Sequence, residues 1–299
     1  MKDKRINRRN FLRLTAAAAV APGMLASTIS LVKADSEKKL HKAVLITMLP
    51  KNLSDVEKFR LAKKCGFEGI EARWPIKDLK NIKAAAEQAR IAREEGLRVH
   101  SLLYGWWPPF TNRDPKVVRK SIEQMQDALR CAQAMQADAV LLVPTRVTEN
   151  FSYQDAYKWS QQYIGRLIPT AEETGVIVAV ENVWNKFLLS PLEFARYIDE
   201  LDSPWVRAYF DVGNIIIYGY AQDWIRTLGK RIIKLHLKDF KRKGYQWTNL
   251  LDGDVNWPEV RKALGEVGFS GWMTAELRSG DEAYLTDVAK RIDRIIAMK

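Results

Sequence analysis

Histidine and cysteine are the residues that this 299-residue chain has least of. It contains three histidines and two cysteines. Cys65 and Cys131 are not spaced as a metal or redox motif, so we expect two buried free thiols. One of the three histidines, His236, stands where an apolar run ends in HLKD, a position that a core residue would not normally occupy.

The chain also lacks a long hydrophobic run. No segment reaches the roughly 18 unbroken apolar residues that a membrane-spanning helix needs, so we expect no stable membrane insertion. Residues 1–34 instead carry Arg8 and Arg9 ahead of an alanine-rich stretch that ends in small residues. This pattern resembles a twin-arginine (Tat) export signal, with a basic amphipathic helix as the alternative. We therefore expect the Tat machinery as a partner and a mature protein that begins near Asp35 in the periplasm.

A dense basic block is missing as well. The formal net charge is +12, but half of it lies in the first 34 residues, where seven Lys or Arg face one acid. The rest of the chain is only mildly basic, which argues against nucleic-acid binding.

The remaining sequence alternates regularly between two kinds of segment. Eight apolar, strand-like runs are each followed by an amphipathic, helix-like one, and they cover 43–49, 68–72, 97–103, 137–143, 176–182, 206–213, 231–239 and 271–278. The helix-like segments are 54–65, 81–95, 115–136, 153–174, 190–201, 221–229, 257–267 and 283–298. Eight repeats in about 260 residues predict one (β/α)₈ barrel over 35–299. An open doubly wound sheet is the alternative, but MLPKNLSD after the first run lacks the glycine-rich turn usual there.

Ionisable residues end the last four predicted strands: Glu181, Asp211, His236 and Glu276. Neighbouring strands lie about 4.8 Å apart, so these side chains can converge on one cation. Three carboxylates and an imidazole suit Mn²⁺, Mg²⁺, Co²⁺ or Zn²⁺, whereas burying the acids together without a cation is costly. The alternative is that each acid forms its own salt bridge at the rim.

Five motifs in the second half of the chain resemble the xylose-isomerase-like TIM barrels. They are VAVENVW (178–184), YFDVGN (209–214), KLHLKDF (234–240), DGDVNW (252–257) and TAEL (274–277). The closest resemblance is to the sugar isomerase/epimerase branch, which includes D-tagatose 3-epimerase, L-ribulose- and L-xylulose-5-phosphate 3-epimerases and hydroxypyruvate isomerase.

The resemblance implies one divalent metal ion bound by the four strand-end residues, with Glu181 and Glu276 also moving the substrate's proton. One carboxylate would remove a proton beside a sugar carbonyl, giving an enediolate. Returning the proton to the opposite face gives an epimer, and moving it between carbons gives an isomer. Relatives of this kind make a homodimer or homotetramer the expected assembly.

Further residues are interpreted as carbohydrate contacts. Many sugar epimerases of this group have a histidine three residues after the aspartate, where this chain has Asn214. A buried core role is the alternative for His100, and a role as rim cations is the alternative for Lys238 and Arg278. Tryptophans in the predicted loops suit stacking on sugar rings, and loop 240–256 is long enough for a lid. The predicted substrate contacts are Glu71, His100, Asn182, Trp184, Asn214, Lys238 and Arg278, and the other loop tryptophans are Trp74, Trp106, Trp107 and Trp247.

One alternative function of this fold is excluded, and two others stay open. Three histidines are too few for the three-zinc DNA-repair endonuclease of the superfamily. A lyase that acts on 3-keto-glycosides and a non-catalytic exported sugar-binding barrel stay open as alternatives. Export favours free or oxidised sugars over phosphorylated ones.

Overall fold

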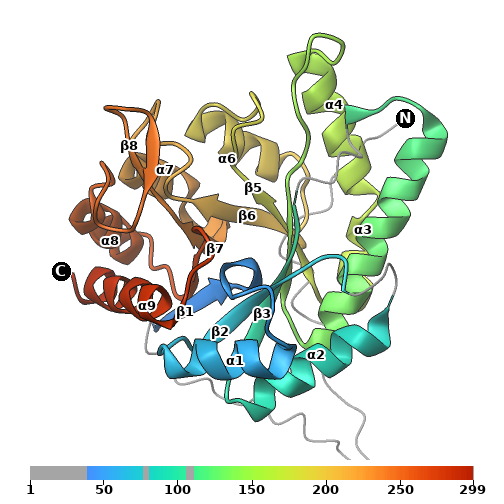
Figure 1. Cartoon of the computed structure of the whole chain (residues 1–299). Coiled ribbons are helices and arrows are strands. Elements are labelled where there is room, and N and C mark those ends of the chain that lie inside the picture. The colour runs from blue at the N-terminus through green and yellow to red at the C-terminus, as the bar shows by residue number, and fades with distance from the viewer. Residues whose placement is uncertain (1–38, 77–80, 106–110, 299) are drawn as a thin grey trace, which may run out of the picture. The chain divides into compact units, whose positions relative to one another are not determined.

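Eight of the described strands form a closed parallel barrel (Figure 1). The computed structural model describes residues 39–76, 81–105 and 111–298, so the predicted signal at 1–34 and two of the tryptophans, Trp106 and Trp107, lie outside the described residues. The strand order is β1-β10-β7-β6-β5-β4-β3-β2, and β1 pairs with both β10 and β2. The predicted (β/α)₈ barrel is therefore confirmed.

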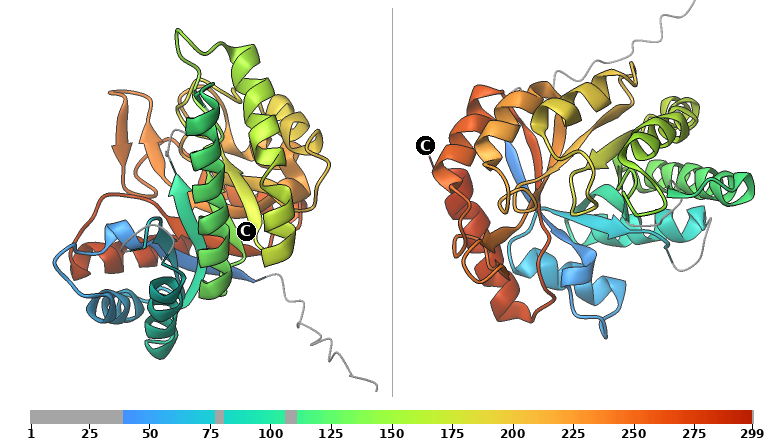
Figure 2. Two further views of the ribbon diagram at one scale, coloured as in Figure 1. Left: turned by 90° about the vertical axis from the view of Figure 1, so that its right-hand side faces the viewer. Right: turned by 90° about the horizontal axis from the view of Figure 1, so that it is seen from above.

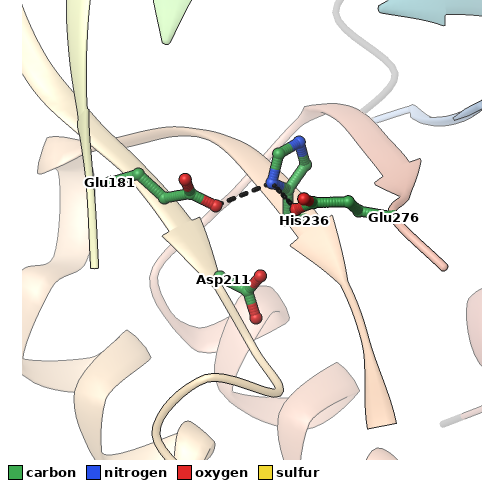
Figure 3. A group of neighbouring side chains, drawn as sticks. All are labelled: Glu181, Asp211, His236 and Glu276. Carbon is green, nitrogen blue, oxygen red and sulfur yellow. Dashed lines mark hydrogen bonds and ion pairs between the residues drawn. The ribbon is translucent and has the colours of Figure 1, made fainter. Parts of the chain in front are cut away.

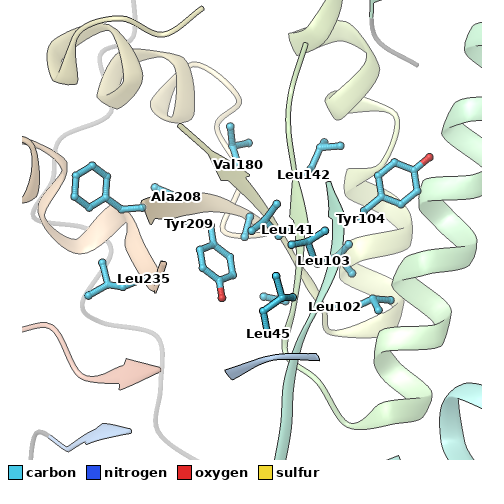
Figure 4. Packing of buried hydrophobic residues seen from close by; sticks show 14 of the residues in the cluster. Leu45, Leu102, Leu103, Tyr104, Leu141, Leu142, Val180, Ala208, Tyr209 and Leu235 are labelled. Atoms are coloured by element: carbon cyan, nitrogen blue, oxygen red, sulfur yellow. The ribbon is translucent and has the colours of Figure 1, made fainter. Parts of the chain in front are cut away.

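The barrel strands are short and mostly buried, as expected of a parallel sheet covered on both faces. They are β1 (Leu40–Leu45), β2 (Gly69–Arg73), β3 (Arg98–Gly105), β4 (Ala139–Leu142), β5 (Ile177–Glu181), β6 (Val206–Asp211), β7 (Ile232–Leu237) and β10 (Gly271–Ala275). Buried side chains from neighbouring strands, among them Leu102, Leu141 and Val180, pack together in the core (Figure 4).

Helices surround the strands (Figure 2). They are α1 (Asp55–Lys64), α2 (Ile82–Glu94), α3 (Pro115–Met135), α4 (Tyr153–Gly165), α5 (Ile168–Thr174), α6 (Pro191–Asp199), α7 (Ala221–Leu228), α8 (Trp257–Glu266) and α9 (Glu282–Ala297), with 3₁₀ turns η2 (Ile46–Met48) and η4 (Gly229–Arg231). In the described part of the chain, no helix combines the length and the apolar character needed to cross a bilayer.

Local sequence explains most helix ends. Ser54 closes a capping box with Glu57 at the start of α1, and Ser190 caps α6 ahead of Pro191. Gly175 ends α5 in a left-handed conformation (φ 67°) that a glycine adopts without strain.

Two predicted segments differ in the structure. The single helix expected over 153–174 is two helices, because Pro169 lies in the first turn of α5, where its ring cannot follow the preceding helical turn. Loop 240–256 holds an antiparallel hairpin, β8 (Asp239–Lys241) and β9 (Gln246–Thr248), which carries Trp247.

Candidate active site

Four ionisable side chains meet at the carboxyl ends of β5, β6, β7 and β10 (Figure 3). They are Glu181, Asp211, His236 and Glu276, and one ligand atom of each lies within 4.8 Å of those of the others. His236 and Asp211 are fully buried, whereas a quarter of the Glu276 side chain is exposed. The structure thus brings together all four residues predicted from the strand ends.

Charged contacts tie the cluster together. His236 Nδ1 lies 2.7 Å from Glu181 Oε1 and 2.7 Å from Glu276 Oε2. The Lys238 ammonium lies 3.1 Å from Asp211 Oδ2 and 2.9 Å from Glu276 Oε2. The three carboxylates therefore share two basic side chains.

Burial and neighbouring charges give Glu181 and Glu276 different pKa values. Burial raises the pKa of Glu181 to about 7, although His236 opposes the shift. Burial also acts to raise the pKa of Glu276, but the charges of His236 and Lys238 outweigh it and lower that pKa to about 2. One carboxylate is ionised at neutral pH and the other can hold a proton, which suits a pair that exchanges a proton with substrate.

The loop after β6 aims one oxygen of Asp211 at the cluster. Its Oδ1 accepts hydrogen bonds from the backbone N–H groups of Gly213 and Asn214, both at 2.8 Å, so Oδ2 faces Lys238. A Cβ on Gly213 would lie 2.6 Å from Lys238 Cβ and 2.9 Å from its backbone, so only glycine allows this approach. The DVGN motif therefore sets the orientation of the carboxylate.

The donor set fits a divalent cation. Three carboxylates and one imidazole form an oxygen-rich set for Mn²⁺, Mg²⁺, Co²⁺ or Zn²⁺. Three acids at this burial are costly unless positive charge compensates them, which a cation would do. Glu181, Asp211, His236 and Glu276 are the residues that would hold it.

A cavity of about 750 Å³ opens above the cluster. Four of the predicted substrate contacts line it, and they are Trp184, Asn214, Lys238 and Arg278. Its wall also includes residues that the sequence did not single out, because they come from the unpredicted hairpin and the first turn of α9: Thr248, Asn249 and Tyr284. The substrate roles of the four predicted residues stay predictions.

Three predicted contacts lie away from the cavity wall. Asn182 binds backbone instead: its Nδ2 donates to Asp211 O (2.9 Å) and its Oδ1 accepts from Asp211 N (2.8 Å). His100 is fully buried, stacks on Trp272 with centroids 4.7 Å apart and lies 3.0 Å from Thr274 Oγ1, so it occupies the core position that was its alternative.

Glu71 is also fully buried and contacts the cluster from within the protein. Its Oε2 lies 2.5 Å from His236 Nε2, and its Oε1 accepts a hydrogen bond from Ser101 Oγ at 2.9 Å. Both carboxylate oxygens are thus engaged, which does not match the predicted contact with a substrate hydroxyl.

The fold and this cluster define a class: a (β/α)₈ barrel with a candidate metal centre at the carboxyl ends of its strands. The chain belongs to the xylose isomerase-like TIM barrel family, whose model matches residues 59–295.

Several sequence relatives are described as sugar epimerases. A putative L-ribulose-5-phosphate 3-epimerase of Escherichia coli (strain K12) is 29% identical over 248 residues, which cover 77% of this chain and 85% of that protein. An L-ribulose-5-phosphate 3-epimerase of Escherichia coli (strain SMS-3-5 / SECEC) is 24% identical over 271 residues, 87% of this chain and 95% of that protein. This similarity supports an isomerase-class enzyme that acts on sugars.

Solved structures agree in fold. A D-tagatose 3-epimerase-like protein superposes with a TM-score of 0.73 at 16% identity, covering 86% of this chain and 98% of that one. The 3-keto-D-glucoside 4-epimerase of E. coli gives a TM-score of 0.69 at 18% identity, covering 86% and 99%. At these identities the likeness concerns the fold.

Proposed function

We propose that this protein is a divalent-metal-dependent sugar epimerase or isomerase that removes a proton beside a sugar carbonyl, through an enediolate. The observation that carries the proposal is the cluster of Glu181, Asp211, His236 and Glu276, with ligand atoms within 4.8 Å of one another in a relative of sugar epimerases. The cation, when bound, supplies positive charge that polarises the carbonyl and acidifies the neighbouring C–H.

The chain's own residues move the proton. Glu276 lines the cavity and its lowered pKa keeps it ionised, so we assign it the removal of the proton. Glu181 lines the same cavity, so we assign it the return of a proton to the substrate. The Lys238 ammonium beside Glu276 can donate hydrogen bonds to a substrate oxygen that gains charge.

The two rival functions use the same residues. An elimination that expels the aglycone of a 3-keto-glycoside would need this centre too, but the relatives named above are epimerases, so we do not favour it. A non-catalytic sugar-binding barrel has no need of two carboxylates on the cavity wall beside a metal-binding set, and both Glu181 and Glu276 are present there.

We further propose that the protein is exported through the Tat machinery and works in the periplasm as a homodimer or homotetramer. The support is the sequence pattern of residues 1–34 and the resemblance described above. Export directs the activity toward free or oxidised sugars.

Metal titration of the chelator-treated protein tests the proposal. We expect wild type to bind about one equivalent of Mn²⁺, Co²⁺ or Zn²⁺, and His236→Ala to lose at least about a hundredfold in affinity because a ligand is gone. The matched control is His41→Ala, since His41 also pairs with a glutamate (Glu68, 2.7 Å) but is partly exposed and lies outside the cluster.

The affinity for the metal ion should fall as the pH is lowered. A cation binds ionised Glu181, whose pKa is about 7, so the affinity should be about tenfold lower at pH 6 than at pH 8. Failure of the wild type to bind any of these ions, or equal binding by His236→Ala, would contradict the proposal.

A further inference from the structure

The cavity above the cluster exceeds the size of one sugar ring. A hexose has twelve non-hydrogen atoms, and even at the roughly 30 Å³ of liquid that each water molecule occupies they would fill about 360 Å³. The cavity measures about 750 Å³, more than twice that volume. Room for a second ring remains beside a ring placed over Glu181 and Glu276.

The cavity wall carries two sets of polar groups. One group surrounds the reacting position and consists of Glu181, Glu276 and Lys238. The other comes from the hairpin strand β9 and the residue that follows it, Thr248 and Asn249. The Thr248 hydroxyl is buried and finds no hydrogen-bond partner within the described part of the chain.

Trp184 and Trp247 form an aromatic part of the same wall, and the Lys238 ammonium lies 5.5 Å from the centroid of the Trp247 ring. Trp184 and Trp247 stack with ring centroids 4.9 Å apart and an interplanar angle of 27°. The Trp184 indole is fixed, because its Nε1 donates to Asn214 O at 2.7 Å and its ring meets Phe240 edge-on. Trp247 lines the cavity yet is 45% exposed, so it presents a rigid apolar surface to whatever enters.

We infer that the substrate is a keto sugar that carries a second ring, as in a disaccharide or a glycoside. The reacting ring lies over Glu181 and Glu276, and the second ring packs its C–H face on Trp247 within reach of Thr248. This inference rests on the proposed function for the chemistry at the first ring, but the position of the second ring follows from the cavity wall.

The rate of deuterium incorporation from D₂O can be compared between one-ring and two-ring substrates. We would compare D-fructose with maltulose and isomaltulose, and methyl 3-keto-glucoside with 3-keto-cellobiose, using the metal-loaded protein. We expect kcat/KM to be at least about tenfold higher for the two-ring member of the preferred pair. Trp247→Ala should remove that advantage, lowering kcat/KM for the two-ring member by about tenfold more than for the one-ring member.

Tyr245→Ala is the matched control. Tyr245 lies on the same hairpin and contacts the same Trp184 ring, but it does not line the cavity. It should change neither rate. Better turnover of one-ring sugars or of L-ribulose 5-phosphate, or an equal loss on both classes in Trp247→Ala, would overturn the inference.

Quenching of tryptophan fluorescence by cellobiose and by glucose gives a readout without turnover. We expect tighter binding of cellobiose, lost in Trp247→Ala and kept in Tyr245→Ala. Absence of deuterium exchange on every probe would count against the proposed function, while preferential cellobiose binding in the same protein would still support the two-ring site. Equal binding of glucose and cellobiose would count against the two-ring site itself.

Discussion

The His236 imidazole is engaged through both ring nitrogens. Nδ1 faces the carboxylates of Glu181 and Glu276, and Nε2 lies 2.5 Å from Glu71, whose other oxygen is bound by Ser101. A carboxylate that accepts the Nε2 proton leaves the Nδ1 lone pair for a cation, the arrangement usual for metal-binding histidines. We therefore interpret Glu71 as a residue that positions His236.

Glu71→Gln should weaken metal binding by about 10- to 100-fold, because the amide is a poorer acceptor for the Nε2 proton. Titration of the chelator-treated variant with Mn²⁺ measures the change. Glu68→Gln is the control, since it alters the other Glu–His pair (His41, 2.7 Å), which is only partly buried and lies outside the cluster. Wild-type metal affinity in Glu71→Gln would show that this hydrogen bond does not position the histidine.

The sequence predicts the four cluster residues and misses the role of Glu71 for a physical reason. Each cluster residue ends a strand, and parallel strands place such ends together. The contact between Glu71 and His236 instead joins β2 to β7, which are not neighbours in the sheet and lie 165 residues apart. The two side chains meet because both point into the closed barrel. No local sequence pattern shows which way a side chain on these strands points.

The segment after β7 is fixed by one buried side chain, Asp239. Its carboxylate accepts from Trp257 Nε1 (2.9 Å) and from the backbone N–H groups of Leu251 (2.9 Å) and Val255 (3.2 Å). Gly253 packs against it so closely that an added Cβ would lie 2.0 Å from Asp239 Oδ1. Asp239 of the KLHLKDF motif and the DGDVNW motif thus together form the base of the hairpin that carries Trp247.

Asp239→Ala should lower the free energy of unfolding by about 3–5 kcal/mol, because several buried N–H donors lose their acceptor. Urea denaturation measures this value. Asp252→Ala lies in the same segment and removes only a half-exposed partner of Arg291, so it should cost less than about 1 kcal/mol. Equal costs for the two variants would show that Asp239 does not anchor the segment.

Element boundaries are predictable where the residues that set them are local. Ser54, Ser190 and Gly175 mark helix ends in the sequence and in the structure. The break between α4 and α5 was missed because the apolar spacing continues across Pro169. The β8–β9 hairpin was missed because its strands have three residues each, too few for a period to show.

Closure of the barrel can be predicted from the number of strand–helix units in the sequence. Eight buried strands in one domain favour closure, since a closed parallel sheet has no exposed edge. The pairing of β1 with β10 joins segments more than 200 residues apart, so it follows from the number of strands and not from any motif.

The twin arginine of the N-terminal segment predicts where in the cell the protein is located. Replacing Arg8 and Arg9 by lysine should keep the protein in the cytoplasm at full length, because the twin arginine is the feature of the signal that the Tat machinery reads. Fractionation with immunoblotting of the wild type and the double variant measures this. Wild-type protein that stays unprocessed in the cytoplasm would contradict the prediction.

We propose that this barrel removes a proton beside a sugar carbonyl with the help of a bound cation. The most direct test of this claim is NMR detection of deuterium at the carbon next to the carbonyl of keto sugars incubated in D₂O with the protein. We predict exchange with metal-loaded wild type, loss of exchange after chelation with recovery on adding Mn²⁺, and at least about a thousandfold slower exchange for Glu276→Gln, which loses both the base and a charged metal ligand. Exchange that persists in Glu276→Gln or after chelation, or no exchange on any keto sugar with the metal-loaded wild type, would contradict the claim.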